Sequence, residues 1–179
     1  MFEIEDRQMR ILAIIILVLL SACSTNKSNL QTVESVDMDR YLGKWYQYAY
    51  IPNSFQPRDG ALTTAEYSLK PNGKISVVNT SYKDWQGTEI KKVAKARAWV
   101  VDPSNAKLKV SFFWPFTGDY WIIDLDQENY SYAVVGEPSL KYLWILSRST
   151  QMDAVLYSEI LERIRNKGYN TDLLVETHP

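Results

Sequence analysis

The sequence predicts an all-β protein, an eight-stranded antiparallel up-and-down β-barrel with one C-terminal α-helix packed outside it. Three observations support this prediction. Short runs of β-type residues follow one another at nearly regular spacing, and turn sequences rich in Gly, Pro, Asn and Asp separate them. A helical period of apolar residues appears only near the end of the chain. A barrel of eight strands is wide enough to hold one small ligand.

The N-terminal residues have the pattern of an export signal. Arg10 precedes an unbroken apolar run over residues 11–20, which the small residues Ser21 and Ala22 follow. The run is shorter than the roughly 20 residues that span a bilayer and lies within the range of about 7–15 found in signal peptides. We expect Met9 to be the true start, because Arg10 would then stand directly before the apolar run.

The stretch "LSAC", residues 20–23, resembles the bacterial lipobox, in which the Cys thiol is acylated and becomes the first residue of the mature lipoprotein. The resemblance implies a signal peptide over residues 1–22 and lipid attachment at Cys23. An ordinary cleavage site before a Cys is the alternative. Ser24 after the Cys implies transport to the outer membrane by the sorting rule of such lipoproteins. Because Cys23 is the only Cys, the fold has no internal disulfide.

Composition and charge argue against nucleic-acid binding and divide the mature chain into a tether and one domain. The chain of 179 residues carries a formal net charge of −1, which is too little positive charge for a nucleic-acid-binding protein. Residues 24–36 are polar and lack sustained periodicity, so residues 23–36 are expected to form the acylated Cys and a flexible tether of roughly 45 Å when extended. Residues 37–179 are long enough for one domain with a substantial core.

Alternating polar and apolar residues define the expected strands. Leu108, Val110 and Phe112 share one face of their run, while the residues between them are polar, which fits a sheet with one wet face. The eight strands are expected at residues 45–51, 62–70, 74–83, 92–101, 106–113, 119–125, 130–136 and 141–148.

A change of period marks the C-terminal helix. Apolar residues at steps of four predict an amphipathic helix whose apolar stripe packs against the barrel; they are Met152, Leu156, Ile160 and Ile164. Thr150 is expected as the N-cap and Gly168 as the C′ residue. Residues 172–176 are expected to add a short strand to the sheet.

Two motifs give the chain a resemblance to the lipocalin family. "GKWY", Gly43–Tyr46, resembles the G-x-W motif of the first lipocalin strand, and "WILSR", ending in Arg148, resembles the third motif. Of the second motif, T-D-Y, only Asp126 is present. With the lipobox added, the chain is similar to the bacterial outer-membrane lipoproteins of that family over residues 37–176.

The resemblance implies a structural base at one end of the barrel. Gly43 is expected to turn the chain tightly, Trp45 to point inward as the floor, and Arg148 to lie across the Trp45 ring and donate to backbone carbonyls. If Trp45 faces inward, alternation also places three further side chains of this strand inside, namely Gln47, Ala49 and Ile51.

Alternation on the other strands predicts a lumen lined by apolar and small side chains. The predicted ligand pocket contains Ala65, Tyr67, Val77, Asn79, Ala96, Ala98, Val110, Phe112, Tyr120 and Ile122. A row of alanines leaves free space inside a barrel, unless neighbouring aromatic rings fill it. The apolar lining suits an acyl chain, and a carboxylate or phosphate head is expected at the mouth, where Arg58 could meet it.

The resemblance implies that the protein binds a fatty acid or a lysophospholipid and acts in lipid storage, transport or repair. It implies a protein that is lipid-anchored in the outer membrane, with the barrel facing the periplasm. The alternative is a structural envelope lipoprotein whose packed barrel serves as a scaffold for a protein partner.

Enzyme and metalloprotein classes find little support in the sequence. The only His is His178 and the only Cys is the expected anchor, so we expect no cofactor, no metal and no Ser-His or Cys-His catalytic device. Asp124 and Asp126 lie two residues apart and could act as acid and base, although carboxylates at a strand end are more commonly solvated turn residues.

The stretch "FFWPFTGDYW", residues 112–121, has an aromatic tip. It could touch a membrane, touch a second subunit in a homodimer, or fold over the end of the barrel, and the sequence leaves all three open.

Overall fold

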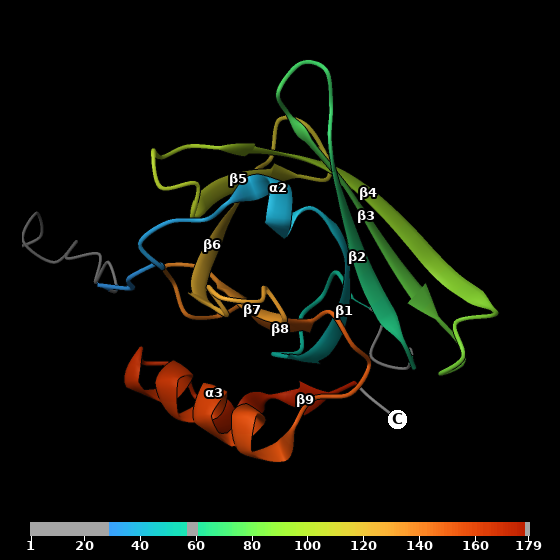
Figure 1. The fold of residues 1–179 in the computed structure, drawn as a ribbon. Coiled ribbons are helices and arrows are strands. Elements are labelled where there is room, and N and C mark those ends of the chain that lie inside the picture. Colours follow the sequence, from blue (N-terminus) through green and yellow to red (C-terminus); the bar gives the residue numbers. More distant parts are fainter. Residues whose placement is uncertain (1–28, 57–60, 178–179) are drawn as a thin grey trace, which may run out of the picture.

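The computed structural model describes residues 29–56 and 61–177, which form an antiparallel barrel with a helix outside it (Figure 1). The predicted fold class is thereby confirmed. The strands are β1 (Gly43–Tyr50), β2 (Thr63–Leu69), β3 (Ile75–Tyr82), β4 (Ile90–Val100), β5 (Lys107–Ser111), β6 (Gly118–Leu125), β7 (Tyr132–Gly136), β8 (Leu143–Ser147) and β9 (Val175–Glu176). Each of the first eight pairs with its sequence neighbours, and pairing of β1 with both β2 and β8 closes the barrel.

A bulge in β1 changes which of its side chains face the lumen. Gln47 pairs with Leu146 and Ala49 with Ile145, so one extra residue of β1 lies between two successive partners of β8. Such an insertion reverses the alternation beyond it. The inward prediction was therefore wrong for Ala49 and Ile51, which pack on the outer, helix-facing side of the barrel.

Residues 29–36 pack against the barrel, which corrects the prediction of a flexible tether for this part of the chain. The Val33 amide donates to Ile122 O at 3.0 Å and the Val36 amide to Ser104 O at 2.8 Å. Leu30 and Val36 are buried, Leu30 beside the outer helix and Val36 in the lumen. Leu30, Val33 and Val36, which lie three residues apart, thus hold a segment of polar overall composition against the barrel.

Two helices flank the barrel. The four-residue helix α2 (Met38–Tyr41) lies across one end of it, and α3 (Ala154–Asn166) runs outside β1, β7 and β8 (Figure 1). Asp153 caps α3, because its Oδ1 accepts the amides of Val155 and Leu156 at 2.9 and 3.0 Å. The prediction of Thr150 as the N-cap was wrong by three residues, whereas Gly168 has the positive φ of 96° expected of a C′ residue.

The buried apolar residues form two clusters, one on each face of the barrel wall. The lumen cluster includes Trp45, Tyr67 and Ile122, and the helix-side cluster includes Ile145, Ile160 and Ile164. After α3 in the chain, the 3₁₀ helix η1 (Thr171–Leu173) leads into β9. β9 pairs with Ala49 and Tyr50 of β1, as predicted for residues 172–176. Within the described ranges, no helix is long and apolar enough to cross a membrane.

Candidate functional site

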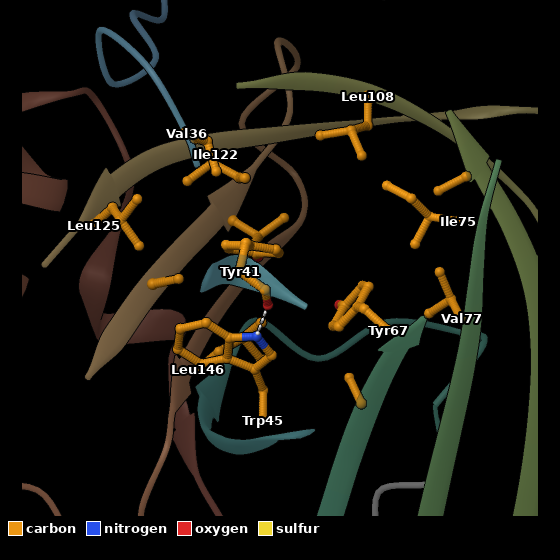
Figure 2. Packing of buried hydrophobic residues seen from close by; sticks show 14 of the residues in the cluster. Val36, Tyr41, Trp45, Tyr67, Ile75, Val77, Leu108, Ile122, Leu125 and Leu146 are labelled. Atoms are coloured by element: carbon orange, nitrogen blue, oxygen red, sulfur yellow. Dashed lines mark hydrogen bonds between the residues drawn. The ribbon is translucent and has the colours of Figure 1, made fainter. Parts of the chain in front are cut away.

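One end of the barrel is closed by α2, Trp45 and Arg148. The Trp45 ring is fully buried, and its Nε1 donates to Tyr41 O at 2.8 Å (Figure 2). The Arg148 guanidinium lies 3.7 Å from the centroid of the Trp45 ring. Gly43 has a φ of 93°, and a Cβ at this residue would lie 3.5 Å from Arg148 Nη1.

Arg148 also supplies hydrogen-bond donors to the end of α2. A helix of one turn leaves its last carbonyl groups without partners inside the helix. Arg148 Nη2 donates to Arg40 O at 2.7 Å, Tyr41 O at 3.2 Å and Leu42 O at 2.9 Å, and Nη1 donates to Lys44 O at 2.7 Å. A cation is favoured beside the negative end of a helix, so this side chain both caps α2 and covers the floor.

Small side chains occupy one wall of the lumen. Ala96 and Ala98 of β4 are buried and pair with Val77 and Ile75 of β3, and Ala65 of β2 pairs with Trp45 of β1. All of these residues belong to the lumen cluster. Because an alanine side chain ends at Cβ, this wall contributes little volume to the interior.

Three tyrosine hydroxyl groups meet inside the lumen. Tyr120 Oη lies 2.6 Å from Tyr41 Oη and 2.9 Å from Tyr67 Oη, so the three form a hydrogen-bonded chain with Tyr120 in the middle. Burial raises the pKa of Tyr67 to about 12 and the pKa values of Tyr41 and Tyr120 well above the usual 10.0. The hydroxyls are therefore neutral at physiological pH. Of their three hydrogens, the two bonds use two, which leaves one donor for another acceptor in the lumen.

Asn79 adds a buried oxygen that has no hydrogen-bond donor beside it in the described part of the chain. It pairs with Ala65 on one side and Ala94 on the other, in the same row as Trp45. Its Oδ1 is buried and has no hydrogen-bond partner among the described residues. A buried acceptor without a partner costs about 1–3 kcal/mol, so Asn79 Oδ1 is a polar point in an otherwise apolar wall.

The end opposite Trp45 is the mouth of the barrel, and a polar network crosses it. The Gln56 side chain donates to Gln47 Oε1 at 2.6 Å and accepts from Trp144 Nε1 at 3.2 Å. Lys92 Nζ donates to Phe55 O at 3.2 Å, joining β4 to the β1–β2 connection. The mouth therefore presents an amide and a cation above an apolar interior.

The structure brings most of the predicted pocket residues together. Ala65, Tyr67, Val77, Ala96, Ala98 and Ile122 are in the lumen cluster, and Val110 and Tyr120 pack against it. Asn79 is half-buried beside the same wall. Phe112 follows the end of β5 and is 41% exposed, outside this cluster. Cys23, Arg58 and His178 lie outside the described residues.

Sequence reasoning missed Tyr41, Gln56 and Lys92. Tyr41 precedes the first strand, and the position of its hydroxyl depends on two strands that lie far away in sequence. Gln56 and Lys92 acquire their positions from bonds across the mouth. No local pattern marks any of the three.

The two carboxylates considered as an acid and a base have structural partners. Asp124 Oδ2 accepts from Arg163 Nε of α3 at 2.7 Å. Burial raises the pKa of Asp126, but hydrogen bonds from the Ser131 side chain and the backbone amides of its turn outweigh that effect and lower it. Asp124 thus ties the helix to the barrel, and Asp126 organises the β6–β7 turn. Within residues 29–56 and 61–177, no group of three or more His, Cys, Asp or Glu side chains could hold a metal ion.

A single-chain antiparallel barrel of eight strands, covered at one end and lined mostly by apolar side chains, belongs to the class of small up-and-down barrels, some of which hold one small ligand. The model of the lipocalin-like domain matches residues 36–179, and the chain therefore belongs to the lipocalin family.

Relatives in the family include bacterial and plant proteins. The chain is 38% identical over 159 residues to outer membrane lipoprotein Blc of Vibrio cholerae, covering 88% of this chain and 91% of that one. It is 37% identical over 162 residues to temperature-induced lipocalin-1 of Arabidopsis thaliana, covering 86% and 84%. Insecticyanin from Manduca sexta has a similar fold, with a TM-score of 0.64 at 18% identity over 84% of this chain and 85% of that one.

Proposed function

We propose that the protein binds a fatty acid or a lysophospholipid with the acyl chain in the lumen. The observation that carries the proposal is the wall of buried alanines, Ala65, Ala96 and Ala98, which faces apolar and aromatic side chains. An acyl chain is narrow, flexible and entirely apolar, so it gains from burial between such walls without requiring a matching polar partner.

The polar groups of the site set the orientation of the ligand. Lys92, at the mouth, is a suitable partner for a carboxylate or phosphate head, in addition to the predicted Arg58. The tyrosine hydroxyls and Asn79 Oδ1 lie within the barrel and carry no charge. A charged head buried there would lose its water, and the neutral groups around it would not compensate for that loss. The head therefore faces the mouth, and the acyl chain enters first.

The cellular setting follows from the N-terminal motif and from the relatives. Several relatives are outer membrane lipoproteins by name. We propose that Cys23 is acylated, that the lipid anchors the protein in the outer membrane with the barrel facing the periplasm, and that the barrel stores, transports or helps to repair envelope lipids. The proposed role is binding, without catalysis.

Native mass spectrometry of the mature protein with oleate or lysophospholipid tests the lumen site. We expect a one-to-one adduct that disappears in Ala98→Phe and Ala65→Phe, because a ring in place of a methyl group would occupy the volume that the proposal assigns to the acyl chain. Ala154→Phe makes the same change at an exposed position of α3 and is the matched control. An adduct that survives both lumen substitutions, or no adduct with either lipid, would overturn the proposal and favour the packed scaffold. The same spectra report whether two barrels pair.

A further inference from the structure

The connection between β5 and β6, residues 112–117, carries an exposed group of aromatic rings. Phe113 is 80% exposed, Trp114 71% and Phe116 77%, and all three belong to one turn. We call them the aromatic tip. Phe112, at the start of the same connection, is 41% exposed, and Val155 on α3 is 67% exposed far from it in sequence. Large apolar side chains gathered on a monomer surface mark a contact site, because water is an unfavourable environment for them.

Hydrogen bonds within this loop close its turn. The Phe116 amide donates to Phe113 O at 2.8 Å, and Ser111 Oγ donates to Phe116 O at 2.8 Å. Because the three rings are between 71% and 80% exposed, they do not pack over the barrel end, which was one of the three alternatives that the sequence left open.

A basic depression adjoins the aromatic tip on the outer wall. It has a volume of about 330 Å³ and is lined by Lys74, Arg97, Trp99, Ser111 and Trp114. Lys74 Nζ also lies over the Trp99 ring, 5.8 Å from its centroid. Aromatic rings beside cations are the combination that the headgroup layer of a bilayer favours, since rings enter the interface and cations meet lipid phosphates.

We propose that the aromatic tip, with Lys74 and Arg97, docks on the surface of a phospholipid bilayer. Phe113, Trp114 and Phe116 enter the headgroup layer, and the two cations face phosphate groups. The proposed anchor favours this occupant over a protein partner, because Cys23 and Asn29 are only six residues apart and can lie at most roughly 20 Å from each other. The inference relies on the proposed function for this proximity and not for the occupancy of the lumen.

Tryptophan quenching by brominated lipid tests the contact. The acylated protein is incorporated into phosphatidylcholine–phosphatidylglycerol vesicles with and without bromine on the acyl chains, and emission is compared. We expect Trp114→Phe to lose about half or more of the bromine-dependent quenching, because Trp114 is the tryptophan of the tip. Trp121→Phe, on the helix-facing side of the barrel, makes the same substitution and is expected to keep it.

Trp114→Phe removes both a membrane contact and a source of fluorescence, so a second pair of variants keeps Trp114 and changes other residues. Phe113→Ser with Phe116→Ser is expected to reduce the quenching of Trp114, whereas Val155→Ser on α3 leaves it unchanged. Equal quenching in wild-type protein and Trp114→Phe would overturn the proposal, as would loss of quenching in Val155→Ser. An aromatic tip that contacts a protein instead gives no bromine-dependent quenching of Trp114 in these protein-free vesicles. Lipid binding in the lumen is read separately by mass spectrometry, so either conclusion can fail alone.

Discussion

Replacing Arg148 by Met should destabilise the barrel through loss of the closure at its base. The substitution keeps much of the aliphatic stem and removes the guanidinium, whose donors reach four backbone carbonyls. Water can replace the donor at Arg40 O and Lys44 O, which are bonded at the surface, and Tyr41 O keeps the Trp45 indole. Leu42 O then has no other donor among the described bonds.

The expected loss is about 3 kcal/mol in the free energy of unfolding. A hydrogen bond from a charged donor to a partly buried acceptor contributes about 1.5–3 kcal/mol, which applies to Leu42 O. The cation–π contact of Arg148 with the Trp45 ring, at 3.7 Å, adds about 0.5–2 kcal/mol. Because both contributions come from one side chain, they are not fully additive, and we take a value near the middle of the summed range of about 2–5 kcal/mol.

Equilibrium unfolding in urea, followed by tryptophan fluorescence, measures this loss. With a slope of about 1–3 kcal/mol per molar urea, the midpoint should fall by about 1–3 M. Arg40→Met is the matched control, because Arg40 also donates to two carbonyls, both at the surface, and its guanidinium also lies over a ring, that of Tyr130. We expect it to lose less than about 1 kcal/mol. If Arg148→Met lost no more than Arg40→Met, Arg148 would not hold the base together.

Three further predictions concern stability. Gly136→Ala should cost about 1–3 kcal/mol in urea unfolding, because its Cβ would overlap Tyr169 Oη, which bonds Glu137 N and O; an unchanged midpoint would contradict this. Asp153→Ala should cost about 1 kcal/mol, and Asp153→Asn much less, because the amide oxygen still caps α3. Stability should be complete below about pH 10 and fall as the pH rises towards about 12, because unfolded tyrosines lose protons there while folded Tyr67 keeps its own. Tyr67→Phe should lose less stability over this range; a decline as steep as that of the wild type would argue against this cause.

The features predicted from sequence are those that depend on neighbouring residues. Period-two alternation located all eight strands of the barrel, and the period of four located α3, because each pattern arises from one element burying one face. Gly168 ends the helix as predicted, since its left-handed conformation is a local property of the backbone.

The features that sequence reasoning missed depend on contacts between distant segments. The bulge in β1 reversed the orientation of Ala49 and Ile51, and alternation alone contains no signal of an inserted residue. Residues 29–36 dock because Leu30, Val33 and Val36 recur at steps of three, a weak pattern that the polar composition obscured. The tyrosine cluster needs α2, β2 and β6 at once, so it becomes visible only when the barrel is closed.

The docking of residues 29–36 changes how closely a membrane anchor at Cys23 would confine the barrel. A free tether over residues 23–36 would reach roughly 45 Å, whereas the part before Asn29 spans at most roughly 20 Å. The volume open to the barrel scales with the cube of this reach, so the local concentration of the lumen at the bilayer rises roughly tenfold. If the anchor and the lumen site are as proposed, the lumen would meet lipids that leave that bilayer roughly ten times as often as it would on a free tether.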